Sequence, residues 1–268
     1  MKDYLADMVA RRRKRIAEEF GSLAPSDLER LVCAAEPPKE FGAALRDRAD
    51  VAIIAEVKKR SPAAGAISPL CEASKQALRY QDGGAAAVSV LTEPEDFGGS
   101  LGDLSDVADA LDVPVLCKDF VVDPAQIALA RSHGADAVLL MVSVLGDQVA
   151  EYIDLVGTFR MTPLVEVIDE HELAIARRAG AQCIVVNSRD LRTLQVDTER
   201  ALAIVTSAAR AGLTVIAASG IESREGVEKA AAAGAHAVLV GSSLMRAEFP
   251  EDAVEDLTGV AVAARHQI

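Results

Sequence analysis

The amino-acid sequence predicts an α/β protein, a (β/α)8 TIM barrel with an N-terminal helical extension. Two observations lead to this prediction. From residue 50 onward, short apolar runs alternate with helix-like segments, and a glycine-led pattern recurs at spacings of 50, 46 and 54 residues. Continuous apolar runs are typical of parallel strands that helices cover on both faces. A period of about 50 residues covers two βα units, so four periods predict eight strands.

The predicted strands are rich in Val, Ile and Ala. They lie near residues 51–57, 85–91, 113–118, 136–142, 162–167, 183–187, 213–218 and 237–241. Segments such as DPAQIALARSHG (123–134) and DEHELAIARRAG (169–180) separate them. Each begins with an Asp that can cap a helix and ends at a Gly that can terminate it.

The glycine-led pattern favours a barrel over the alternative, an open doubly wound sheet. It reads GAAAVSV (84–90), GADAVLL (134–140), GAQCIVV (180–186) and GAHAVLV (234–240). An open sheet usually has fewer strands, and nothing in that fold requires a sequence pattern that recurs four times.

Residues 1–50 are predicted to form the helical extension, packed on a barrel of residues 51–268 as one domain. The stretch MKDYLADMVARRRKRIAEEF reads as one helix, and Pro25 and Ser26 begin a second. The basic run Arg11 to Arg15 is interpreted as a solvated helix face, because its neighbours are acidic and no aromatic residues interleave with it.

Composition argues against several classes of function. A net charge of −13 disfavours binding to nucleic acid or to an anionic membrane surface. No apolar run approaches the roughly 20 residues that cross a bilayer, and the first 20 residues lack a signal-peptide core, so a cytoplasmic protein is expected. Protein partners stay open.

Cysteine and histidine are scattered, with no metal-ligand spacing, so no metal site is predicted. The two cysteines that lie in apolar runs are expected to be small core residues, and the histidines structural or surface residues. The cysteines and histidines of the chain are Cys33, Cys71, Cys117, Cys183, His133, His171, His236 and His266.

The odd-numbered strands share one chemically distinctive position. Aligning VAIIAEVK, VPVLCKD, TPLVEV and TVIAASG brings Glu56, Lys118, Glu166 and Ala218 into register. Lys58 shares the face of Glu56, whereas Lys59 alternates to the other side. Carboxyl ends of barrel strands form the active-site mouth, so these charges are expected to converge there. A buried ion-pair network is one interpretation. General acid–base catalysis is favoured, because the charges gather at one end of the barrel.

Two later loops predict an anion site. Ser219-Gly220-Ile221 follows the seventh strand, and Gly241-Ser242-Ser243-Leu244 follows the eighth. Small residues let backbone N–H groups approach a phosphate, although ordinary tight turns are the simpler alternative. After the sixth strand, Asn187 can hydrogen-bond a polar group and Arg189 can bind a carboxylate.

The motifs IIAEVKKRSP, LTEPEDFGGSL, PVLCKDF, ADAVLL, PLVEV, VNSRDL, ASGI and VGSSLM occur in this order over about residues 50 to 246. In these motifs the chain resembles the indole-3-glycerol phosphate synthase family of tryptophan biosynthesis. The resemblance implies a carbon–carbon lyase that needs no cofactor and no metal. Its phosphosugar substrate would be 1-(2-carboxyphenylamino)-1-deoxyribulose 5-phosphate, which closes to indole-3-glycerol phosphate with loss of carbon dioxide and water.

The resemblance also implies catalytic roles. Lys118 would be the general acid of ring closure and Glu166 the base. Lys58 would bind substrate and protonate the leaving hydroxyl. Which of the two lysines performs which proton transfer is left open by the resemblance. Glu56 would hold the lysines, and Asn187 would position the substrate.

The remaining implied residues bind substrate. Ser61 and Arg189 would lie near the anthranilate side, and Phe97, Phe120 and Leu191 would line the apolar ring pocket. The phosphate would be cradled by Ser219, Gly220, Gly241 and Ser242.

One position departs from the family pattern. The family commonly has AESG at the seventh strand, and here Ala218 replaces the Glu. An active synthase is the favoured interpretation, because the other charged positions are retained. A paralogue with a modified substrate, a non-catalytic phosphosugar-binding barrel and another phosphosugar barrel such as an isomerase are the alternatives.

Overall fold

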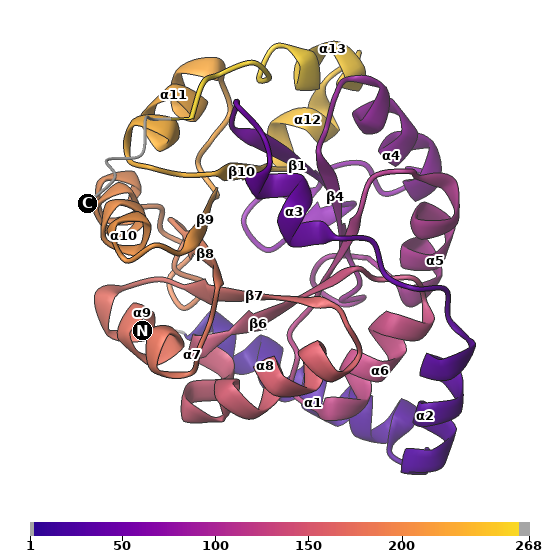
Figure 1. Cartoon of the computed structure of the whole chain (residues 1–268). Coiled ribbons are helices and arrows are strands. Elements are labelled where there is room, and N and C mark those ends of the chain that lie inside the picture. The colour runs from indigo at the N-terminus through magenta and orange to yellow at the C-terminus, as the bar shows by residue number, and fades with distance from the viewer. Residues whose placement is uncertain (1–2, 263–268) are drawn as a thin grey trace.

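The computed structural model describes residues 3–262, in which eight parallel strands close into a barrel (Figure 1). The strands are β1 (Ala52–Val57), β4 (Ala87–Leu91), β5 (Val115–Lys118), β6 (Ala137–Met141), β7 (Thr162–Val167), β8 (Cys183–Asn187), β9 (Thr214–Ala218) and β10 (Ala237–Val240). The first strand pairs with the last, with Ala52 opposite Ala237 and Ala55 opposite Val240. The predicted barrel is therefore confirmed, and the open-sheet alternative is wrong. His266 lies outside the described residues.

Helices surround the barrel and connect its strands (Figure 1). They are α4 (Ala73–Asp82), α5 (Leu101–Ala110), α6 (Pro124–Ser132), α7 (Val142–Leu145), η1 (Gly146–Gln148), α8 (Val149–Thr158), α9 (Glu170–Arg178), α10 (Thr198–Arg210), α11 (Arg224–Ala232), α12 (Ser242–Arg246) and α13 (Pro250–Glu255). The predicted caps are present, because the side chains of Asp123 and Asp169 accept hydrogen bonds from the first turns of α6 and α9.

The repeated glycines explain why the pattern recurs. Gly84, Gly134, Gly180 and Gly234 have φ angles of +92°, +83°, +84° and +100°, and each lies between a helix and the next inner strand. Residues with a Cβ atom avoid this left-handed region, so glycine ends each helix and turns the chain back into the barrel.

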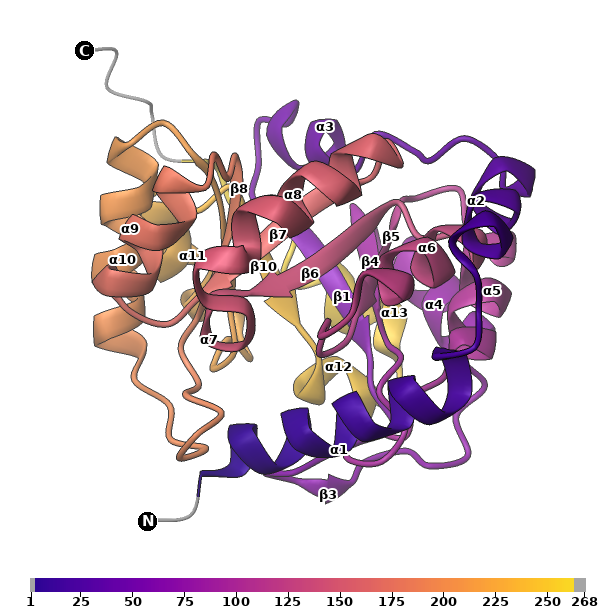
Figure 2. The same cartoon turned by 90° about the horizontal axis from the view of Figure 1, so that it is seen from below.

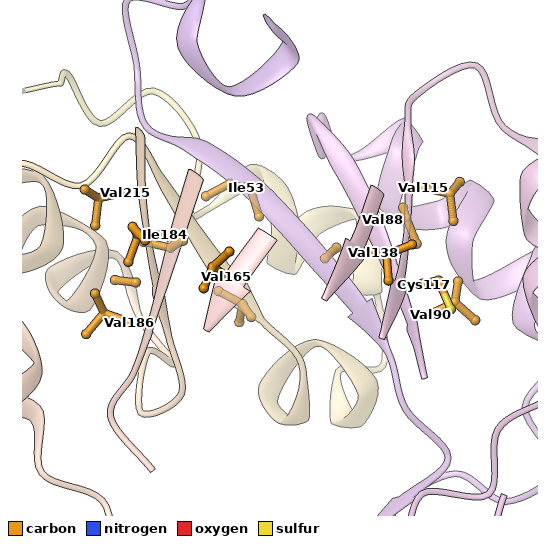
Figure 3. Close-up of a cluster of buried hydrophobic side chains, with 14 of the residues drawn as sticks. Ile53, Val88, Val90, Val115, Cys117, Val138, Val165, Ile184, Val186 and Val215 are labelled. Atoms are coloured by element: carbon orange, nitrogen blue, oxygen red, sulfur yellow. The ribbon is translucent and has the colours of Figure 1, made fainter. Parts of the chain in front are cut away.

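Side chains alternate between two cores. One face of each strand packs against the outer helices, and Figure 3 shows Val88, Val115 and Val138 of neighbouring strands in this outer cluster. The other face fills the barrel interior with residues such as Ile54 and Leu164. Because strand residues two apart share a face, the inward rows continue to the polar residues at the strand ends.

The N-terminal extension packs against both ends of the barrel. It comprises α1 (Tyr4–Phe20), α2 (Pro25–Ala34) and α3 (Phe41–Arg46), of which α3 was not predicted. Phe41 and Leu45 of α3 are buried with the interior cluster at the end where the strands begin. Figure 2 shows α1 across the opposite end, beside a small hairpin of β2 (Arg60–Ser61) and β3 (Gly65–Ala66). No helix within residues 3–262 is both long and apolar enough to cross a membrane.

The interpretation of the basic run in α1 as a solvated face is wrong for Arg12. Its side chain is only 5% exposed and pairs with Asp119, next to the end of β5. Arg11 and Arg15 contact acidic side chains nearer the surface. The error arises because an ion pair with a residue 107 positions away leaves no local pattern in the sequence.

Candidate active site

A cavity of about 300 Å3 opens at the carboxyl ends of the strands. It brings together thirteen of the fourteen residues predicted from the sequence, along with Ala218. The thirteen are Glu56, Lys58, Ser61, Phe97, Lys118, Glu166, Asn187, Arg189, Leu191, Ser219, Gly220, Gly241 and Ser242. Phe120 borders a small adjoining cavity that it shares with Phe97, Lys118 and Leu191.

Two lysines converge on one buried carboxylate. Lys58 Nζ lies 2.7 Å from Glu56 Oε1, and Lys118 Nζ lies 3.5 Å from Glu56 Oε2. Burial opposes ionisation of Glu56, but the two ammonium groups outweigh it and lower the pKa of its carboxyl. Burial likewise opposes the charge on Lys118, and the carboxylates of Glu56 and Glu166 outweigh it and raise the pKa of the ammonium. Lys118 is therefore held protonated at the cavity wall.

Glu166 differs from Glu56 in its hydrogen bonding and in the direction of its pKa shift. It is 1% exposed, and neither carboxylate oxygen makes a hydrogen bond of good geometry within residues 3–262. Burial raises the pKa of Glu166, and the nearby Lys118 and Asn187 counteract the rise only in part. A carboxylate with a raised pKa and free lone pairs is suited to accept a proton. The mouth thus contains an acid and a base in neighbouring positions.

The missing side chain of Gly241 leaves room for the Glu56–Lys58 ion pair. A Cβ atom at Gly241 would lie 2.5 Å from Glu56 Oε1 and 3.1 Å from Lys58 Nζ. Its backbone φ of −130° is not in the left-handed region, and the observed obstacle to a side chain here is the lack of space beside Glu56 and Lys58. Sequence reasoning assigned Gly241 only to the phosphate loop, because its proximity to Glu56 follows from the pairing of the first and last strands.

Asn187 and Arg189 form a short turn at the end of β8. The Asn187 side-chain oxygen accepts a hydrogen bond from the Arg189 backbone N–H at 3.0 Å. The Arg189 guanidinium donates to the carbonyl of Leu194 at 2.8 Å. One end of the guanidinium is therefore anchored in the loop, and the side chain lines the cavity.

The two loops predicted to bind an anion lie on the same side of the cavity. Ser219 and Gly220 have φ angles of +67° and +72°, and the hydroxyl of Ser188 donates to the Ser219 carbonyl at 2.8 Å. Ser242 and Ser243 begin α12, and the buried Ser243 hydroxyl has no hydrogen-bond partner in the described chain. Ser243 and the exposed Arg246, neither of which was predicted as a site residue, also line the cavity.

The aromatic side of the cavity is held by a residue that sequence reasoning missed. Phe97 and Phe120 lie with ring centroids 6.0 Å apart at an interplanar angle of 56°, a favourable tilted arrangement. The buried carboxylate of Glu93 accepts hydrogen bonds from the backbone N–H groups of Asp96 and Phe97 at 2.7 and 3.0 Å. Glu93 therefore fixes the loop that presents Phe97.

Lys59 takes no part in the cavity, as the strand alternation predicted. Its ammonium lies 2.7 Å from Asp103 at the start of α5. This ion pair ties the loop after β1 to the neighbouring unit.

A model of the family described as indole-3-glycerol phosphate synthase matches residues 5–257. The chain belongs to the indole-3-glycerol phosphate synthase family. Relatives with that name include proteins from Mycobacterium ulcerans, 43% identical over 247 residues, and Mycobacterium tuberculosis, 44% identical over 246 residues. Each match covers 91% of this chain and 90% of the relative. The family inferred from the motifs is thereby confirmed.

Solved structures of more distant proteins share the fold. A 3-hexulose-6-phosphate synthase superimposes with a TM-score of 0.63 at 17% identity, covering 77% of this chain and 98% of the other. Thiamine phosphate pyrophosphorylase from Pyrococcus furiosus gives a TM-score of 0.57 at 17% identity, covering 77% and 93%. At this identity the likeness concerns the barrel alone.

Proposed function

We propose that this chain is an indole-3-glycerol phosphate synthase that acts on 1-(2-carboxyphenylamino)-1-deoxyribulose 5-phosphate. The observation that carries the proposal is the arrangement of the cavity. Lys58, Lys118 and the buried Glu166 lie in a mouth bounded on one side by Phe97 and Leu191. Small-residue loops suited to a phosphate lie on another side. Such a cavity matches a substrate with an aromatic ring at one end and a phosphate at the other.

Ring closure requires an acid near the ketone. The ring carbon that bears the carboxylate attacks the ketone carbon, and the carbonyl π electrons move onto oxygen. Lys118 donates a proton to this oxygen, and its high pKa keeps the proton available. Carbon dioxide then leaves, and the electron pair of the broken bond restores the aromatic ring.

Dehydration requires a second acid and a base. The hydroxyl departs as water with a proton from Lys58 or Lys118, while Glu166 removes a proton as the indole double bond forms. The free oxygens and raised pKa of Glu166 suit it to this step. Glu56 contacts both lysines and holds them at the cavity wall.

The binding residues divide by chemistry. The aromatic ring would contact Phe97, Phe120 and Leu191, and the anthranilate carboxylate would lie near Ser61 and Arg189. The phosphate would take backbone N–H groups from the loops at Ser219-Gly220 and Gly241-Ser242. No step in this scheme transfers an electron or needs a bound metal.

Ala218 does not require a different function. It is 4% exposed and lies in register with Asn187 and Leu239 on the neighbouring strands. Lys58 and Lys118 both contact the carboxylate of Glu56, so each lysine already has an acidic partner without a third carboxylate at this position. The alternatives raised by this position, a modified substrate or a binding-only barrel, are not favoured by the comparisons with relatives.

The test is direct turnover. Purified full-length protein is incubated with the substrate, and product is followed by indole fluorescence and by release of carbon dioxide. We expect saturable turnover that is unchanged after dialysis against a chelator. Tight binding of the substrate without turnover would reject the proposal and favour a binding protein.

A further inference from the structure

The N-terminal helix α1 is joined to the strand of the proposed acid by a buried bidentate ion pair. Arg12 Nε and Nη2 donate to the two oxygens of Asp119 at 2.8 and 2.7 Å. The side chains of Arg12 and Asp119 are 5% and 4% exposed. Two parallel charge-assisted hydrogen bonds fix both distance and orientation between the partners.

Asp119 directly follows Lys118, and a third residue ties both to the barrel. The Thr92 hydroxyl donates to Asp119 Oδ2 at 2.7 Å, and the Thr92 backbone N–H donates to the Lys118 carbonyl at 3.0 Å. The end of β5 is therefore held from the neighbouring strand by Thr92 and from the N-terminal helix by Arg12.

Arg12 also offsets part of the effect of burial on the Asp119 carboxyl. Burial raises the pKa of Asp119, while Arg12 and Thr92 act to lower it. Removal of one member of a buried ion pair leaves an uncompensated charge, which the protein relieves by protonation or by movement of the chain. Either response reaches the adjacent Lys118 through one peptide unit.

We propose that Arg12 is a positioning residue, which sets the orientation of Lys118 toward Glu56 and the substrate through Asp119. This inference rests on the proposed function, in which Lys118 is an acid. It gives the basic run of α1 a role in the reaction, although no part of Arg12 lines the active-site cavity. Supporting residues that lock a reacting group commonly decide whether its geometry is productive.

The test compares Arg12→Met with two controls. Arg13→Met changes an exposed arginine of the same helix. Asp136→Asn weakens the opposite end of the same strand, where this buried carboxylate accepts the Val115 backbone N–H at 2.7 Å. The Asp136 control separates general loosening of β5 from misplacement of its end at Lys118. Thermal unfolding and circular dichroism establish the folded fraction of each variant.

We expect kcat of Arg12→Met to fall about 10- to 100-fold, the effect of misplacing a reacting group by about 1 Å. The inhibition constant of inorganic phosphate stays at the wild-type value, because the phosphate loops lie on other strands. The basic limb of the pH–kcat profile moves to lower pH, because a looser contact between Lys118 and Glu56 reduces the rise in the Lys118 pKa. A purely structural anchor would lower the melting temperature without moving this limb.

Arg12→Lys keeps the positive charge but cannot form the two parallel hydrogen bonds, so its kcat is expected to lie between those of the wild type and Arg12→Met. It replaces Arg12→Met as the test variant if the Met variant does not fold. Wild-type kcat and an unmoved basic limb in a folded Arg12 variant would overturn the inference and leave the proposed function intact. A loss of equal size in Asp136→Asn would also overturn it. Absence of turnover in the wild type would instead reject the proposed function, and this inference with it.

Discussion

Replacing Gly241 by Ala adds one methyl group at the most crowded point of the mouth. The new Cβ atom would lie 2.5 Å from Glu56 Oε1, so Glu56 must retreat by about 0.9 Å to reach ordinary contact near 3.4 Å. The Glu56–Lys58 distance of 2.7 Å lengthens if Lys58 keeps its place. At an effective dielectric constant of about 20, this lengthening weakens the attraction by about 1.5 kcal/mol.

The expected consequence is a loss of kcat/KM of about 10- to 100-fold, since both the pairing energy and the position of a reacting group change. The measurement is initial rate by indole fluorescence between pH 5 and 9.

Gly157→Ala is the matched control, because a Cβ atom there meets no atom within 4 Å. It should leave kcat/KM unchanged. Wild-type kcat/KM in Gly241→Ala would refute the reasoning, since the ion pair would then tolerate the displacement.

Three further predictions address other parts of the molecule. Lys118→Ala should lower kcat by about 10²- to 10⁴-fold with an unchanged circular dichroism spectrum, and a wild-type kcat would reject its role as the acid. Ala218→Glu should lower kcat/KM, because a larger, charged side chain must be accommodated at a position that is only 4% exposed; a rise would identify Ala218 as a defect. Burial raises the pKa of Glu172 to about 7, so the protonated form favours the fold and stability falls as pH rises from about 4.5 through 7. Glu172→Gln should therefore melt at a higher temperature than the wild type at pH 8, with the difference shrinking toward pH 5, and a constant difference would contradict the assignment.

The barrel was predictable because its repeat has a local physical cause. Gly84 and its three counterparts must adopt positive φ at the same step of each repeat, so the pattern survives in the sequence. The convergence of Glu56, Lys118 and Glu166 was predictable for a similar reason. Strand alternation and the common direction of parallel strands place these side chains at one end of one interior.

The interactions that escaped prediction join segments far apart in the chain. Arg12 looked solvated because its partner Asp119 is 107 residues away. The contact between Gly241 and Glu56 exists because the first and last strands pair to close the barrel. The identity of either residue alone does not indicate that these two strands are neighbours. The short helix α3 escaped because its six residues are too few to show a helical period. Glu93 was missed since its partners are backbone N–H groups, which every residue supplies.

The barrel closes where β1 pairs with β10, and this junction lies within the proposed catalytic centre. Glu56 belongs to the first strand to be synthesised, Lys58 directly follows that strand, and Gly241 follows the last strand. Contacts between such distant segments form late in folding, because a long loop must close first. Recovery of activity during refolding should therefore trail the recovery of helical structure. A nascent or truncated chain that lacks β10 contains both lysines and both carboxylates, yet the wall that confines the ion pair is missing until the ring has closed.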